Sequence, residues 1–198
     1  MIKTQYHSYR LQLLCGLLLS FLLLSGCSQQ LQRQTCVALT EGVSYCLAPV
    51  STQVEQGTHS QTVQFSHDGQ SHQLITELQI DQYTMTLVGL APLGQPLFTI
   101  VYDGNNLISQ QSSLLGEAFK AEYLMAILQL VYWPTEEVNQ HLSSGSWQQQ
   151  ACLSALCRQL TQDNVILHAE YSQNNPWQAA ININITQADV QIRIQALQ

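Results

Sequence analysis

The sequence predicts an α+β fold in which a large, curved antiparallel sheet carries helices on its apolar face. Three observations lead to this prediction: strands that alternate between apolar and polar residues, turn signals that recur roughly every ten residues, and one apolar helical stretch. Strict alternation is typical of a sheet with one covered and one solvated face. Chain length suits a single domain, which we assign to residues 35–198.

The strands are recognised from their alternation and from the turns between them. Residues 62–66 are joined to residues 71–80 by a turn with Asp68 and Gly69 at its centre. In the next strand, residues 83–90, Tyr83, Met85 and Leu87 are expected to share one face. Further strands are predicted at residues 96–102, 107–109, 164–171, 181–186 and 190–195.

A helix is predicted over residues 117–133, where neither glycine nor proline interrupts the chain and Glu117 lies in the first turn. From residue 123 onward nearly every residue is apolar, with Gln129 the exception. A helix that is apolar almost all round is buried on most sides, and this one is too short to span a bilayer. A second, short helix is expected at residues 135–142.

The N-terminus has the layout of a secretory signal peptide over residues 1–26. Lys3 and Arg10 precede an apolar run, residues 11–24, and small residues follow it. The alternative is an uncleaved membrane anchor, but the run is shorter than the roughly 20 residues that a spanning helix needs.

The segment Leu24-Ser25-Gly26-Cys27 resembles the lipobox of bacterial lipoproteins. The resemblance implies a diacylglycerol on the Cys27 thiol, cleavage before Cys27 and acylation of the new amine. Ser28 follows, whereas Asp at that position favours inner-membrane retention in the lipoproteins that this one resembles. We therefore expect a lipid anchor in the outer membrane, facing the periplasm. Residues 27–34 would then be the lipidated cysteine and a polar tether.

Four further cysteines remain after the signal, namely Cys36, Cys46, Cys152 and Cys157. An even number in an oxidising compartment predicts disulfides. The close spacing within each pair favours Cys36–Cys46 and Cys152–Cys157. A metal site is the rival interpretation, but neither pair has the short Cys-x2-Cys spacing that zinc sites use, so we expect no metal.

Charge and motifs exclude several classes of function. Once Lys3 and Arg10 are removed with the signal, four basic residues face thirteen acidic ones. These basic residues are scattered, so the electrostatic footprint of a nucleic-acid-binding protein is missing. The sequence also contains neither a Gly-x-Ser-x-Gly elbow nor a phosphate-binding glycine loop. We expect no enzyme and no cofactor.

Two remaining polar features are interpreted as structural. Asp103 could be a catalytic acid, but a turn between two strands explains it without function. His59, His67 and His72 lie close in sequence, yet no carboxylate or cysteine pattern completes a metal site there, which favours surface histidines.

The residues around the Tyr-Asp-Gly turn and the end of the apolar helix resemble a family of uncharacterised bacterial outer-membrane lipoproteins. In that family a Gly-x-x-Leu strand ends in Tyr-Asp-Gly and a helix ends in Trp-Pro. The matching residues are Gly94, Leu97, Tyr102, Asp103, Gly104, Trp133 and Pro134. Genes of the family often lie beside those for fatty-acid-like or aryl-polyene synthesis.

The layout also resembles LolB, the outer-membrane receptor that takes lipoproteins from the periplasmic carrier LolA. This resemblance implies a half-open antiparallel barrel with helices that lid an apolar cavity for acyl chains. We therefore expect a non-catalytic lipoprotein that binds a lipidic or acyl-bearing cargo, including a lipoprotein delivered by a LolA-like carrier, and helps to place it in the outer membrane. The alternative is a structural subunit of an envelope complex that holds a partner protein through the sheet edge or face.

An acyl site needs only apolar lining and volume. The candidate lining residues are Leu87, Phe98, Ile100, Leu124, Ile127, Leu128 and Trp133. For any single one of them, simple packing in the core is the better interpretation. As a set beneath a curved sheet, they could instead line a cavity.

Replacing Cys27 with Ala tests the lipobox. The variant is expected to leave the precursor unprocessed or to release the body from the membrane, because the lipidated thiol is lost. Membrane fractionation and electrophoretic mobility measure both effects, with Cys15→Ala inside the signal as control. Unchanged processing and attachment of Cys27→Ala would refute the lipobox.

Overall fold

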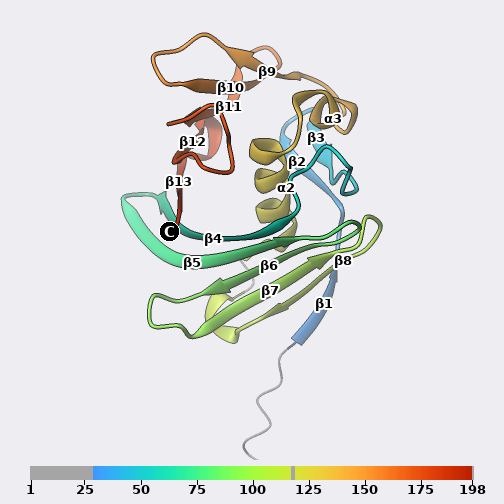
Figure 1. Cartoon of the computed structure of the whole chain (residues 1–198), viewed down its shortest axis with the longest axis vertical. Coiled ribbons are helices and arrows are strands. Elements are labelled where there is room, and N and C mark those ends of the chain that lie inside the picture. The colour runs from blue at the N-terminus through green and yellow to red at the C-terminus, as the bar shows by residue number, and fades with distance from the viewer. Residues whose placement is uncertain (1–28, 117–118, 198) are drawn as a thin grey trace, which may run out of the picture.

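The computed structural model describes residues 29–116 and 119–197, and its main feature is an eleven-stranded antiparallel sheet (Figure 1). The predicted signal peptide and Cys27 lie outside the described residues. The strand order is β1-β8-β7-β6-β5-β4-β13-β12-β11-β10-β9. The strands are β1 (Gln29–Arg33), β4 (Gly57–His67), β5 (Gln70–Ile80), β6 (Met85–Leu90), β7 (Pro96–Tyr102), β8 (Leu107–Gln111), β9 (Ser146–Gln150), β10 (Leu156–Thr161), β11 (Val165–Tyr171), β12 (Ile181–Ile185) and β13 (Val190–Ala196).

A small hairpin and a few helices complete the described part of the chain. The hairpin is β2 (Cys36–Thr40) with β3 (Val43–Cys46), and the helices are α2 (Ala121–Tyr132), α3 (Thr135–Gln140) and two short 3-10 turns, η1 (Ser113–Leu115) and η2 (Thr186–Ala188). Among the described helices, none has the length and hydropathy needed to cross a bilayer.

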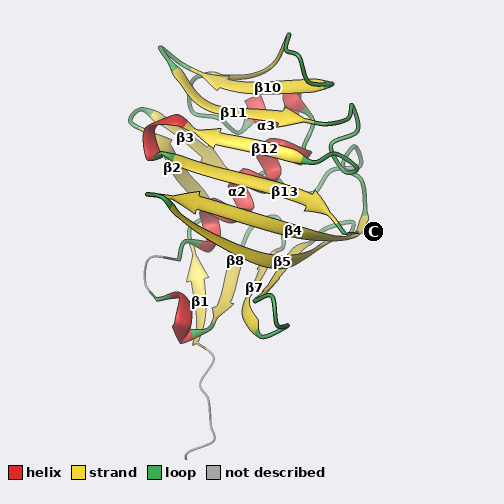
Figure 2. Cartoon of the chain, turned by 90° about the vertical axis from the view of Figure 1, so that its left-hand side faces the viewer, coloured by secondary structure: helices red, strands yellow, loops and turns green. Residues whose placement is uncertain are grey.

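The sheet is open and curved, as the sequence predicts for its α+β class (Figure 2). Most neighbours in the sheet are also neighbours in sequence. The exceptions are β4 with β13, which joins the earlier and the later part of the sheet, and β1 with β8. We call the face on which α2 packs the concave face and the opposite one the outer face.

The predicted alternation is confirmed in β5. Leu74, Thr76, Leu78 and Ile80 point to the concave face and are buried or half-buried, whereas the exposed side chains of this stretch point outward. The hairpin turn at Asp68 and Gly69 is also confirmed: both residues have positive φ, 49° and 72°, as a two-residue hairpin turn requires.

Helix α2 is enclosed on almost every side, as its apolar sequence predicts. Ala121 and all residues from Met125 to Tyr132 are buried. In Figure 1 the helix lies between the sheet and the β2–β3 hairpin. Its only strongly polar buried residue, Gln129, accepts hydrogen bonds from the Tyr45 hydroxyl (2.9 Å) and the Ala48 amide (2.8 Å). The Gln129 amide in turn donates to the Ala48 carbonyl at 2.8 Å.

The start of this helix differs from the prediction. Residues 117 and 118 lie outside the described residues, and the helix begins at Ala121 because Lys120 is extended, with φ −119° and ψ 93°. The extended chain lets the Phe119 ring pack against Phe98, with ring centroids 4.9 Å apart. A side-chain contact with the sheet thus accompanies the later helix start.

Two strand predictions are also corrected. Tyr83 does not share a face with Met85 and Leu87: it is 68% exposed, because the Asp81 amide bonds to the Thr84 carbonyl (2.9 Å) and closes a turn. Gln29–Arg33, expected within the polar tether, instead form β1, which pairs with β8. The folded part therefore begins before residue 35. Strands β2, β3, β9 and β10 were not predicted.

Both predicted disulfides are present. Cys36 and Cys46 are directly opposite each other in the β2–β3 hairpin, and Cys152–Cys157 closes the loop that leads into β10. Each bridge therefore closes a short local loop, and neither joins distant parts of the sheet.

Replacing Gln129 with Leu is expected to lower the free energy of unfolding by about 3 kcal/mol or more, since three buried polar groups lose their partner at about 1–3 kcal/mol each. Urea unfolding measures the change. Gln73→Leu, an exposed position on β5, is the control and should change stability by less than about 0.5 kcal/mol. Equal stability of the two variants would contradict the structural role of Gln129.

Candidate functional site

The structure brings the seven candidate cargo-lining residues into one apolar cluster on the concave face. Leu87 and Phe98 with Ile100 come from β6 and β7, and the others come from α2 and its C-terminal cap. Six of the seven are buried, and Leu124 is half-buried against them. Whether they contact a cargo stays a prediction.

Phe98 reaches this cluster because the opposite residue has no side chain. Gly89 pairs with Phe98 across β6 and β7. A Cβ added at Gly89 would lie 2.2 Å from the Phe98 ring, far inside van der Waals contact. The glycine therefore lets the ring lie flat over the sheet, where it also meets Phe119.

The concave face is not completely covered. Several apolar side chains pack against the core but stay half-buried, namely Val63, Phe65, Leu74, Leu97, Phe119 and Leu124. Val63, Phe65 and Leu74 lie at the β4–β5 hairpin, where Val63 and Leu74 are opposite each other. The alternation of residues 62–66 places Val63 and Phe65 on one face of the strand and their polar neighbours on the other. It does not predict that the Val63 and Phe65 side chains stay partly exposed.

One end of the concave face is closed by an aromatic stack. Trp177 lies between the rings of Tyr132 (4.2 Å) and His59 (4.4 Å). His59, which the sequence predicts to be a surface histidine, is half-buried in this stack. Burial lowers its pKa. Tyr132 accepts a 2.7 Å hydrogen bond from the Gln61 amide, and burial raises the pKa of its phenol, which keeps it neutral.

The Trp-Pro motif ends α2 and ties it to the far half of the sheet. Arg158 donates from Nη1 to the carbonyls of Val131 and Trp133, both at 3.1 Å. The Tyr171 hydroxyl donates to the same Val131 carbonyl at 3.0 Å. A cation at the C-terminal carbonyls complements the helix dipole, and Pro134 supplies no amide to continue the helix. The motif is explained by packing.

The Tyr-Asp-Gly motif forms the turn that the sequence predicts. Asp103 Oδ1 accepts from the backbone amides of Asn105 (2.9 Å) and Asn106 (2.6 Å). These hydrogen bonds lower the pKa of the Asp103 carboxyl. The Tyr102 hydroxyl lies 2.8 Å from the Leu47 carbonyl and joins the turn to the segment after β3.

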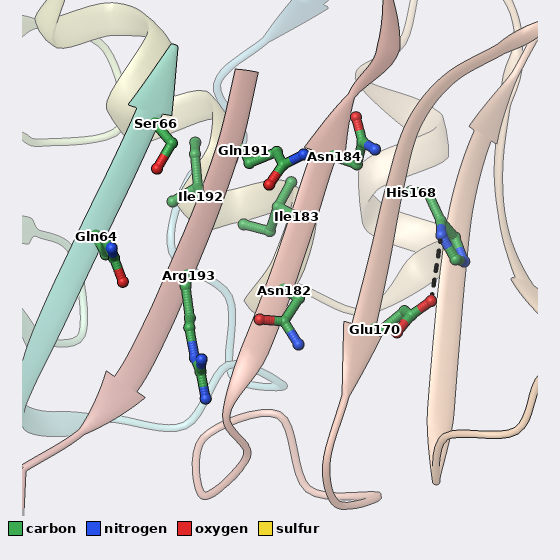
Figure 3. A pocket seen from close by; sticks show the side chains of 10 residues that line it. All are labelled: Gln64, Ser66, His168, Glu170, Asn182, Ile183, Asn184, Gln191, Ile192 and Arg193. Carbon is green, nitrogen blue, oxygen red and sulfur yellow. Dashed lines mark ion pairs between the residues drawn. The ribbon is translucent and has the colours of Figure 1, made fainter. Parts of the chain in front are cut away.

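A hollow of about 440 Å³ lies on the outer face, where the sequence gave no functional prediction. We call it the outer groove; ten residues on four strands line it (Figure 3): Gln64, Ser66, His168, Glu170, Asn182, Ile183, Asn184, Gln191, Ile192 and Arg193. Four of the ten side chains are amides, and the others are one guanidinium, one carboxylate, one imidazole, one hydroxyl and two isoleucines. The only available sequence signal was the amide-rich alternation of the last two strands.

A three-residue cluster beside the groove does not make a metal site in this disulfide-bonded form. Ligand atoms of Cys157, His168 and Glu170 lie within 4.8 Å of one another. However, Cys157 is bonded to Cys152, so its sulfur is not a thiolate, the form that binds metals. His168 and Glu170 alone, 3.8 Å apart, are too few for the four ligands of a structural zinc site.

Fold and surfaces together define a class: an open antiparallel sheet that encloses an apolar helix and carries a polar outer groove. Residues 58–198 match the family described as "Protein of unknown function (DUF3261)". Since the match covers more than half of the chain, the protein belongs to this family. A comparison with curated proteins finds no match.

Replacing Asp103 with Asn is expected to destabilise the turn in a pH-dependent way. The pKa of Asp103 in the folded protein lies below its ordinary value. The carboxylate therefore stabilises the fold at pH values above the ordinary pKa, and this contribution is lost as the pH falls through the lowered pKa. Urea unfolding across acidic pH measures it: the difference between wild type and Asp103→Asn should be largest near neutrality and should vanish in strong acid. A difference independent of pH would contradict this account.

Proposed function

We propose that this protein is a membrane-anchored, non-catalytic binding protein of LolB-like fold, which holds a lipidic or acyl-bearing cargo on its concave face and helps to place it in the outer membrane. The observation that carries the proposal is the continuous apolar cluster of the concave face, whose rim of half-buried side chains is incompletely covered. A LolA-like carrier would deliver the cargo.

An acyl chain suits this face better than a polar ligand does. The buried amide of Gln129 is engaged with Ala48 and Tyr45. Among the described residues, Trp133 Nε1 is a buried polar atom of the cluster that has no hydrogen-bond partner. Each methylene that leaves water contributes about 0.8 kcal/mol, and this gain requires no specific polar partner. Phe65, Leu74 and Leu124 are half-buried, so contact with a chain would remove apolar surface from water.

The position of β1 supports an orientation toward the membrane. A lipid on Cys27 would be attached two residues before Gln29, within about 7 Å of extended chain. Gln29 pairs with Gln111, which lies just before η1. In this part of the sheet Leu114 in η1 is 69% exposed and Leu93, in the β6–β7 turn, is 99% exposed. Both could contact the bilayer that holds the anchor.

The test uses the full-length lipoprotein in lipid nanodiscs that contain a phospholipid with a diazirine at the end of one acyl chain. Photolysis followed by peptide mass spectrometry locates the crosslinks. We expect crosslinks in residues 121–133 and in the β4–β5 hairpin. Crosslinks confined to residues 27–28 and to the loops at residues 91–95 and 112–116 would contradict acyl binding, while leaving membrane attachment intact.

Replacing Leu124 with Asp should weaken crosslinking to residues 121–133 about tenfold, because a carboxylate beside an acyl chain costs more than the ~1.4 kcal/mol that a factor of ten represents. Leu153→Asp, at a fully exposed leucine in the loop before β10, is the matched control and should crosslink like wild type. Equal loss in both variants would show that the crosslinks do not report on the concave face.

A further inference from the structure

The outer groove is built from two rows of polar side chains that cross four strands. Register places Gln64, Arg193, Asn182 and Glu170 directly opposite one another in the first row. Ser66, Gln191, Asn184 and His168 form the second row in the same way. Figure 3 shows the side chains that line the groove. Ile183 and Ile192 lie opposite each other between the two rows and also belong to the buried core.

Most of the hydrogen-bonding capacity in the groove is unused by the protein. Within residues 29–116 and 119–197, the side chains of Arg193, Asn182 and Asn184 have no protein partner at hydrogen-bond distance, and Arg193 makes no ion pair. An amide offers two donors and one acceptor with two lone pairs, and a guanidinium offers five donors. The groove therefore presents many donors and acceptors on a rigid sheet.

We infer that the outer groove is a second binding site, and that its ligand is a neutral, hydroxyl-rich glycan chain. A hydroxyl both donates and accepts, as the amides of Asn182, Asn184 and Gln191 do. Adjacent strands lie about 4.8 Å apart, so a row offers polar groups at a regular spacing to an extended chain of sugar rings. A volume of about 440 Å³ lies within the size range of ligand sites.

The charges of the groove argue against other ligand classes. Arg193 and Glu170 carry opposite charges on either side of Asn182 in the same row. The whole chain is acidic, with a net charge of −7. A polyanion needs a cluster of basic residues to neutralise its charges. An acyl chain would leave the amides without partners, and a peptide strand adds at a sheet edge, whereas this groove lies on a face.

The test measures saturation-transfer NMR from the full-length lipoprotein in nanodiscs to two neutral probes, cellotetraose and N-acetylated chitotetraose, and to a heparin tetrasaccharide. We expect transfer to a neutral probe. Asn182→Ala combined with Arg193→Ala should weaken that binding about tenfold through the loss of several hydrogen bonds. All replaced side chains are exposed, so the fold should be preserved.

Gln148→Ala is the matched control, since Gln148 is an exposed amide on β9 outside the groove. It should bind the neutral probe as wild type does. The inference is overturned if neither neutral probe receives saturation, if the double variant binds as well as the control, or if only the heparin fragment binds. None of these outcomes depends on acyl binding at the concave face.

Discussion

The burial of α2 is the constraint on which the rest of this structure depends. A helix that is apolar on all sides must be surrounded, and a flat sheet can cover only one side. The open sheet curves along one side of the helix, while the β2–β3 hairpin and the segment after it meet the other. Gln129 fixes this arrangement, because its amide is satisfied only when Ala48 and Tyr45 are in place.

The same enclosure explains the two motifs of the sequence. The Trp-Pro end of α2 places its last carbonyls against Arg158 and Tyr171, in the half of the sheet that comes later in the chain. The Tyr-Asp-Gly turn holds the segment that contains Ala48, through the contact between Tyr102 and the Leu47 carbonyl. Both motifs thus position the cover of the helix, and we assign neither to catalysis.

Much of the fold could be predicted because its strands alternate and its turns carry Asp-Gly or Asn residues. Among the missed strands, β1 lacked that signal: it is nearly all polar, and its residues form a strand because β8 offers an unpaired edge. Tertiary contacts also moved the start of α2, through the Phe119–Phe98 pair. The apolar lining could be named from sequence, whereas the outer groove could not, because it depends on strands distant in sequence coming into register.

The central claim is that an acyl chain binds between α2 and the concave face. Its most direct test is a crystal structure of the protein with a phospholipid brominated along one acyl chain, with bromine located by anomalous scattering. The account predicts bromine peaks beside Leu124 and Phe98, within the apolar cluster. Bromine peaks only at the surface around Leu93 and Leu114, with an unchanged and filled concave face, would contradict it.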